Sequence, residues 1–158
     1  MIFKTKRLIL RSPRKEDWKD IVEGVKDIEV SRMLLTVPHP YTKKDASWWI
    51  DKTIKNGKKK DKDDYVFVIE LESERKVIGV TSVHHIDEQS KKCYTGSWVN
   101  RKYWGKGYIL EAKVSVLDFV FHKLKLRKNE TMVFAENTAS NNMSKKLGFK
   151  HEGFKRKT

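Results

Sequence analysis

The chain has 158 residues, of which 38% are hydrophobic and 35% charged, and its formal net charge at pH 7 is +14. This length fits one domain with one core, and the five Trp, five Tyr and seven Phe exclude wholesale disorder. No apolar run approaches the roughly 20 residues of a membrane helix, and the start lacks the pattern of a signal peptide. We therefore expect a soluble, cytoplasmic protein without a membrane partner.

The positive charge favours contact with nucleic acid, ribosomes, acidic peptides or a polyphosphate ligand, and it disfavours cationic substrates. The densest run of charge, residues 57–64, alternates in sign toward its end, which is typical of a solvated loop. The lone Cys93 can form no internal disulfide, and without a nearby His pattern it indicates no metal site. Charge alone leaves the class of partner open.

The first third of the chain combines one strand signal with helix signals. Residues 3–11 predict a strand, and Pro13 then opens a helix whose apolar residues recur at helical spacing. A second short helical stretch, residues 30–35, ends before Pro38 and Pro40, which exclude a continuing helix.

A third helix and a hairpin follow. Thr42 with Asp45 three residues later is a variant capping box, so we expect a helix from there to Gly57. Residues 65–71 and 76–85 are β-rich apolar runs separated by a four-residue turn, which predicts a hairpin of buried strands.

The last part of the chain centres on a strand, a glycine loop and a helix. Residues 91–99 predict a strand, and apolar positions from 109 to 124 predict a long amphipathic helix. The remaining expected elements are a strand at 131–135, a short helix at 140–147 and a last strand at 149–154.

Two glycines, Gly105 and Gly107, lie between the predicted strand and the helix. Glycines there allow a tight turn that aims several backbone N–H groups at one point near the start of the helix. Phosphate gains from those donors and from the helix dipole, while Lys102 and Lys106 add positive charge. A Gly-x-Gly pair taken alone favours a plain tight turn, and the spacing is not that of a nucleotide P-loop.

The segment Lys102–Gly107 resembles the acetyl-CoA loop of the GNAT superfamily, which runs Gln or Arg, two residues, Gly, one residue, then Gly or Ala. The longer phrase from Tyr103 to Tyr108 is similar to the branch that contains the ribosomal-protein N-terminal acetyltransferases. Further similarity to that branch extends over nearly the whole chain, at Pro40-Tyr41-Thr42, Trp49-Ile50, Glu111-Ala112, Asn137-Thr138-Ala139-Ser140, Leu147-Gly148-Phe149 and Glu152-Gly153.

This resemblance implies one α/β (α+β) acetyltransferase domain over residues 1–158. Its sheet would be mixed and mostly antiparallel, flanked by helices and splayed between the fourth and fifth strands. Acetyl-CoA would lie in that cleft as cosubstrate, and the amine would attack it directly, without an acyl-enzyme.

The resemblance also assigns residues to the cofactor. Backbone at Trp98 and Val99 would pair with the pantetheine arm, and the Val99 N–H would polarise the thioester carbonyl. Asn137 would hold the pantetheine or the incoming amine, and Ser140 would combine helix capping with cofactor contact. The loop residues implied to bind acetyl-CoA are Lys102, Trp104, Gly105, Lys106, Gly107 and Tyr108.

The groups that move protons depart from the family pattern. Many relatives have a tyrosine as general acid where this chain has Ser144, and many members of the branch have a glutamate base where it has Tyr94. His84 and His85 are candidate bases because histidine titrates near neutral pH, and a regular strand would place one on each side of the sheet. Asp87 and Glu88 are fallback candidates, and adjacent histidines at a strand end are also often merely solvated.

The relatives usually continue past the Gly153 region into a loop and another strand, whereas this sequence stops at Thr158. A shortened sequence, loss of that strand, or a partner chain covering the edge in a homodimer are the alternatives.

The branch implies a protein N-terminal amine as acceptor, with the basic surface suited to ribosomes. A small amine such as a polyamine or aminoglycoside is the enzyme alternative, although a basic site disfavours such cations. A non-catalytic CoA-binding or nucleic-acid-binding module is the alternative from another class, because the usual Glu and Tyr are missing.

Overall fold

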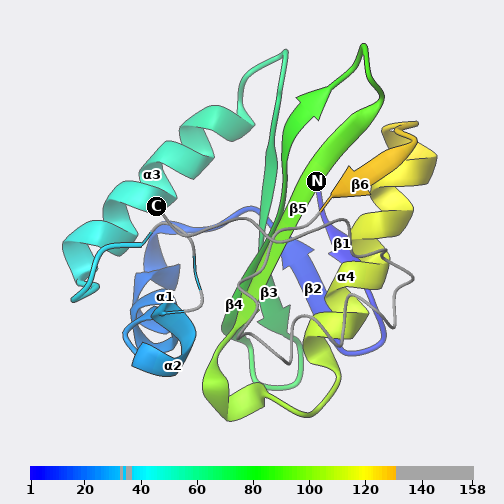
Figure 1. Cartoon of the computed structure of the whole chain (residues 1–158). Coiled ribbons are helices and arrows are strands. Elements are labelled where there is room, and N and C mark those ends of the chain that lie inside the picture. The colour runs from blue at the N-terminus through cyan, green and yellow to red at the C-terminus, as the bar shows by residue number, and fades with distance from the viewer. Residues whose placement is uncertain (33, 35–36, 131–158) are drawn as a thin grey trace.

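The computed structural model describes residues 1–32, 34 and 37–130. In this part, six strands form one sheet in the order β1-β2-β3-β4-β5-β6 (Figure 1). Neighbouring strands pair antiparallel except β5 and β6, which pair parallel. The mixed, mostly antiparallel sheet flanked by helices is therefore confirmed, while the course of the predicted splay past residue 130 lies outside the described residues.

The predicted first strand, residues 3–11, is wrong as a single element, because it forms two short strands. β1 (Phe3–Lys4) turns back on β2 (Leu8–Arg11), with Phe3 opposite Leu10. Thr5 stabilises the turn, since its N–H donates to the Leu8 carbonyl at 2.9 Å and its hydroxyl accepts the Leu8 N–H at 3.0 Å. A polar residue that satisfies the backbone of a turn offers an alternative to a continuous ladder.

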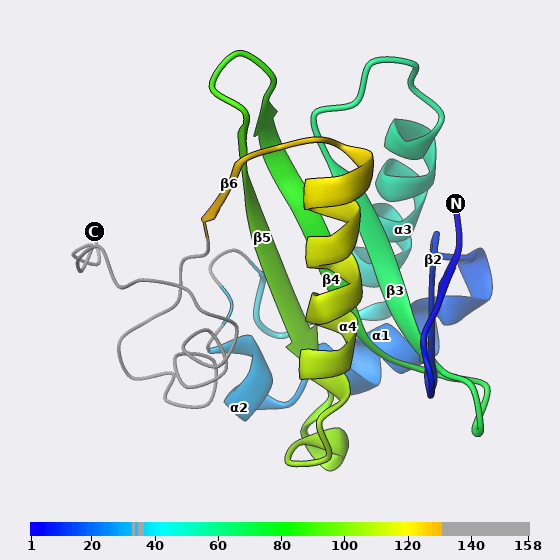
Figure 2. The same ribbon diagram turned by 90° about the vertical axis from the view of Figure 1, so that its right-hand side faces the viewer.

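Helices cover both faces of the sheet (Figures 1 and 2). α1 (Trp18–Val25), α2 (Ile28–Ser31) and α3 (Lys43–Gly57) lie on one side, and α4 (Tyr108–Asp118) lies on the other. Each side has its own apolar core. The capping box is confirmed, because the Asp45 carboxylate accepts the Thr42 N–H at 2.8 Å.

The central strands match the sequence patterns closely. β3 (Tyr65–Leu71), β4 (Lys76–Asp87) and β5 (Lys92–Val99) form the predicted hairpin and the strand after it. The α4 helix ends in a wider π turn at Phe119–Lys123, so the long predicted helix is not uniform. β6 (Lys128–Glu130) begins before the strand predicted at 131–135, which lies outside the described residues. No helix in the described ranges is long and apolar enough to span a membrane.

One charged side chain, Lys113, lies in the apolar packing of α4 with 5% of its surface exposed. In the described part of the chain, no carboxylate lies within 4.0 Å of its ammonium. Burial alone lowers the pKa of Lys113 to about 8. Because one pKa unit is worth about 1.4 kcal/mol, the buried charge destabilises the fold by on the order of 3 kcal/mol at neutral pH.

We therefore expect Lys113→Met to raise the free energy of unfolding at pH 7 by about 1–3 kcal/mol. The unfolded chain keeps the Lys113 proton up to its ordinary pKa, while the folded chain releases it near pH 8. The difference in free energy of unfolding between Lys113→Met and the wild type should therefore shrink as pH rises above 8. Urea unfolding of both proteins from pH 7 to pH 10 measures this. Lys123→Met, at an exposed position, is the control, and an equal gain there would contradict the explanation.

Candidate functional site

The glycine loop has the conformation that its sequence predicts. Gly105 and Gly107 have φ angles of +77° and +80°, and Gly107 caps the eleven-residue helix α4. Residues with a side chain rarely adopt these φ angles, so glycine is required at both positions. A Cβ on Gly105 would meet no atom within 4 Å, so the space above the loop is open. A helix start with open space beside it is suited to an anionic group.

The two loop lysines differ in their surroundings. The Lys102 ammonium donates to the Glu23 carboxylate at 2.8 Å, and Lys76 binds the same carboxylate at 2.8 Å. Hydrogen bonds from these two lysines lower the pKa of Glu23. Lys106 lies 5.7 Å from the centre of the Tyr103 ring and, in the described part of the chain, has no carboxylate within 4.0 Å. Of the two loop lysines, Lys106 is therefore the one whose ammonium is available to bind a phosphate.

Polar side chains from the β1–β2 turn hold the glycine loop and the start of α4 in place. The Glu111 carboxylate accepts the Arg7 Nε–H at 2.8 Å, the Arg7 backbone N–H at 2.9 Å and the Thr5 hydroxyl at 2.6 Å. Burial would raise the pKa of Glu111, but these hydrogen bonds outweigh it and lower the pKa. Arg7 also donates to the Lys106 carbonyl at 3.0 Å and lies 4.3 Å over the Tyr108 ring. The sequence analysis missed Thr5 and Arg7, whose partner Glu111 is more than a hundred residues away.

The end of β5 presents backbone to the side on which β6 lies. Asn100 donates its N–H to the Ile78 carbonyl at 2.7 Å, and hydrogen bonding alternates along an antiparallel strand, so the N–H of Val99 points away from β4. The Val99 carbonyl, which points the same way, accepts the Trp104 indole N–H at 2.8 Å. Trp104 therefore stabilises the end of β5, and the Val99 N–H points away from β4 and takes no part in the β4–β5 ladder.

Gly79 on β4 is a second residue that the sequence analysis missed. It lies opposite Val99, and a Cβ built on it would be 2.1 Å from the Trp98 carbonyl oxygen and 3.0 Å from the Val99 Cα. The close approach of two backbones requires glycine here. An isolated glycine within a strand pattern was the available signal.

The prediction that His84 and His85 face opposite sides of the sheet is wrong. His85 has a φ of +51°, and the β4–β5 register shifts after His84, so the strand bulges there. Both imidazole rings therefore lie against the Tyr94 ring, and the distance between ring centroids is 6.2 Å for His84 and 5.8 Å for His85. His84 is half-buried, and this burial, followed by the nearby charge of His85, lowers the pKa of His84, against the opposing effect of Asp64.

Tyr94 stands where many members of the branch have a glutamate. Its neighbour on β6 is Glu130, and a hydrogen bond from the Tyr94 hydroxyl is the main cause that lowers the pKa of Glu130. The Glu130 carboxylate on β6 therefore lies beside the position where those relatives have their glutamate. Asp87, a fallback base, instead accepts two backbone N–H groups in its own turn, and hydrogen bonding there lowers its pKa.

A half-buried strip of side chains runs along β4 and β5 on the face that α1 covers. Trp98 is on this face, because a Cβ on Gly24 of α1 would lie 2.6 Å from its ring. Side chains two apart on a strand, and those directly opposite on its partner, share a face. The strip therefore consists of Trp98, Gly96, Tyr94, Ser82 and His84, all half-buried.

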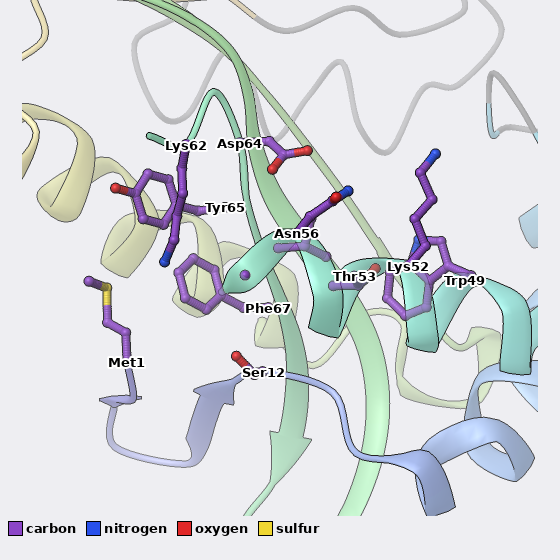
Figure 3. Close-up of a pocket in the computed structure, with 12 residues that line it drawn as sticks. Met1, Ser12, Trp49, Lys52, Thr53, Asn56, Lys62, Asp64, Tyr65 and Phe67 are labelled. Atoms are coloured by element: carbon purple, nitrogen blue, oxygen red, sulfur yellow. The ribbon is translucent and has the colours of Figure 1, made fainter. Parts of the chain in front are cut away.

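A separate pocket of about 200 Å³ lies between the second half of α3 and the start of β3 (Figure 3). Trp49, Lys52, Asn56, Tyr65 and Phe67 are among its lining residues. None of its lining residues belongs to the glycine loop or to the strip, so it is separate from the site. Asn137, Ser140 and Ser144, which the sequence analysis singled out, lie outside the described residues.

Residues 7–150 match the family model described as an acetyltransferase (GNAT) domain. The chain belongs to the GNAT family. Among curated proteins, this GNAT chain is similar to the uncharacterized N-acetyltransferase p20 of Bacillus licheniformis, with 29% identity over 154 residues that cover 96% of this chain and 84% of p20. It is thus an N-acetyltransferase, and acetyl-CoA is its cosubstrate.

Two solved structures share the fold. The ribosomal-protein-S5-alanine acetyltransferase of Vibrio fischeri has a TM-score of 0.81 at 20% identity, over 97% of this GNAT chain and 85% of that one. The microcin C7 self-immunity acetyltransferase MccE, in complex with acetyl-CoA and AMP, has a TM-score of 0.79 at 18% identity, over 94% of this chain and 82% of MccE. The open space above Gly105 and the free charge of Lys106 fit the phosphates of such a cosubstrate.

Proposed function

We propose that this GNAT enzyme acetylates the N-terminal amine of a protein or peptide, in the cytoplasm and near the ribosome. The observation that carries the proposal is the half-buried strip on β4 and β5, which contains no carboxylate of its own. A polyamine needs acidic side chains to balance its charge, but the strip has none, and Glu130 beside it is already engaged by Tyr94 and Lys128. A strip of this kind suits the end of a polypeptide. The likeness in fold to a ribosomal-protein acetyltransferase agrees with this choice.

The cosubstrate supplies an activated acetyl group as a thioester. We propose that the backbone N–H groups of Gly105, Gly107 and Tyr108, with Lys106, hold its phosphates. The remaining residues proposed to contact it are Trp98, Val99, Lys102, Trp104, Asn137 and Ser140. The Val99 N–H would donate to the carbonyl oxygen, where negative charge develops during attack.

His84 is our proposed general base. Its ring belongs to the strip, and its lowered pKa keeps the imidazole neutral at pH 7, ready to take the proton of the acceptor ammonium. The amine nitrogen then bonds to the acetyl carbon while the carbon–sulfur bond breaks. The nitrogen gives up one of its two remaining protons to solvent and the leaving thiolate takes one proton, for which we propose Ser144 as the donor, so the products are an amide and a thiol.

The acceptor assignment predicts turnover with a free peptide N-terminus. We expect thiol release from acetyl-CoA with peptides that have a free α-amine, and mass spectrometry should place the acetyl group there. A peptide blocked at its N-terminus but containing an internal lysine is the matched control and should be inert. Turnover with spermidine but with none of the peptides would reject the assignment, and acetyl-CoA binding without any turnover would favour the non-catalytic module.

A second prediction concerns His84. Protonation removes a base, so we expect kcat/KM of the wild type to fall as pH drops through the lowered pKa of His84. His84→Ala should lose this acidic limb and reduce kcat by roughly 100-fold, with the KM for acetyl-CoA unchanged. His85→Ala, beside it but more exposed, is the control, for which we expect a change below about threefold. An acidic limb that persists in His84→Ala would contradict the assignment.

A further inference from the structure

The outer side of α3 carries a row of exposed residues that the acetyl-transfer site does not use. Lys44, Trp48, Lys52 and Lys55 follow helical spacing and are all exposed. Trp48 has 64% of its surface exposed. In Figure 1 no described helix or strand lies beyond α3 on the side away from the sheet. A large exposed aromatic residue among cations on one helix face suggests a binding surface.

The charge of this surface is not neutralised. The segment 43–62 contains eight lysines and three aspartates, so five of the net +14 charges of the chain fall in it. In the described part of the chain, none of these lysines has a carboxylate within 4.0 Å. Asp45 is engaged at the helix start by Thr42. The positive field is therefore available to an anionic partner.

The aromatic ring narrows the choice of partner. The Lys52 ammonium lies over the Trp48 ring, 4.9 Å from its centroid, so a cation and an aromatic ring share this surface. Proteins that bind single-stranded nucleic acid combine a positive surface along the phosphates with aromatic rings on which bases stack. An acidic peptide would use the lysines but not the ring, and a second copy of this face would bring like charges together.

We propose that the α3 surface, defined by Lys44, Trp48, Lys52 and Lys55, binds single-stranded RNA. The lysines contact phosphates, and Trp48 stacks on an unpaired base. This binding surface is separate from the glycine loop, and it does not depend on which amine the enzyme acetylates.

The test is fluorescence anisotropy with a fluorescein-labelled twelve-nucleotide uridine RNA over a range of KCl concentrations. We expect the wild type to bind with a Kd that rises steeply with salt. Trp48→Ala should weaken binding on the order of 10-fold, and Trp48→Phe should restore most of it. Lys44→Ser/Lys52→Ser/Lys55→Ser should reduce the slope of log Kd against log salt by about 2.

The matched control removes three exposed cations elsewhere, as Lys26→Ser/Lys123→Ser/Arg127→Ser. It lowers the net charge equally and should change Kd by less than about threefold. All the substituted residues are exposed on the surface, and acetyl-CoA binding checks that each variant folds.

Four outcomes would overturn the proposal. The first is no binding of the RNA at low salt, and the second is an equal loss in the control triple variant. The third is that Trp48→Ala binds the RNA as tightly as the wild type does, or that the wild type binds an RNA duplex equally well. Either result would leave only general charge attraction as the cause of binding. The fourth is a dimer that Trp48→Ala converts to a monomer, which would identify the surface as an interface between two copies.

Discussion

Gly79→Ala should reduce kcat/KM on the order of 100-fold, because the new methyl group displaces the strand end that presents Val99. A Cβ at position 79 would lie 2.1 Å from the Trp98 carbonyl oxygen, and backbone cannot rotate aside as a side chain can. A displacement of about 1 Å in a positioning group can cost 100-fold in rate. We also expect a loss of about 1–3 kcal/mol in the free energy of unfolding, typical of overpacking.

Steady-state kinetics and urea unfolding measure these two effects. Gly57→Ala is the matched control, since a Cβ there meets no atom within 4 Å, and it should leave both quantities nearly unchanged. If Gly79→Ala folded and kept its rate within about threefold, the position of Val99 would not matter to catalysis, and its proposed role would fall.

Gly105→Glu should weaken acetyl-CoA binding by at least about 100-fold, as calorimetry would show. The side chain forces a residue with a φ of +77° into strain worth roughly 1–3 kcal/mol and brings a negative charge to the anion site. The free loop relaxes from the strained angle and must return to it on binding, so the strain enters Kd. Each 1.4 kcal/mol is about tenfold in Kd, so about 2 kcal/mol of strain and about 1 kcal/mol of charge repulsion together give about 100-fold. The open space beside Gly105 lets the variant fold, so circular dichroism should be unchanged.

Gly105→Ala separates the two causes, because it introduces the strain without the charge and should lose about 30-fold. Equal binding by wild type and Gly105→Glu would remove the loop from the cosubstrate site. If the wild type itself did not bind acetyl-CoA, the proposed roles of the loop and of Val99 would both fail.

The sequence by itself determined the elements whose signals are local. The Thr42–Asp45 capping box marks the start of α3, and turn residues bracket β3 and β4, because propensity and turn chemistry act over a few residues. The loop at Gly105 and Gly107 was also predictable, since positive φ angles need glycine wherever the loop occurs. These signals, together with the family resemblance, were sufficient for the mixed sheet and the cosubstrate.

Only the tertiary structure decided the features that depend on distant residues. Glu111 meets Thr5 and Arg7 across more than a hundred positions, at the turn where the predicted first strand divides in two. The bulge at His85 brings both histidines against Tyr94, although alternation along a regular strand would have separated them. The physical reason is the same in both cases: long-range hydrogen bonds and strand register override local periodicity, and neither is encoded within a short window of sequence.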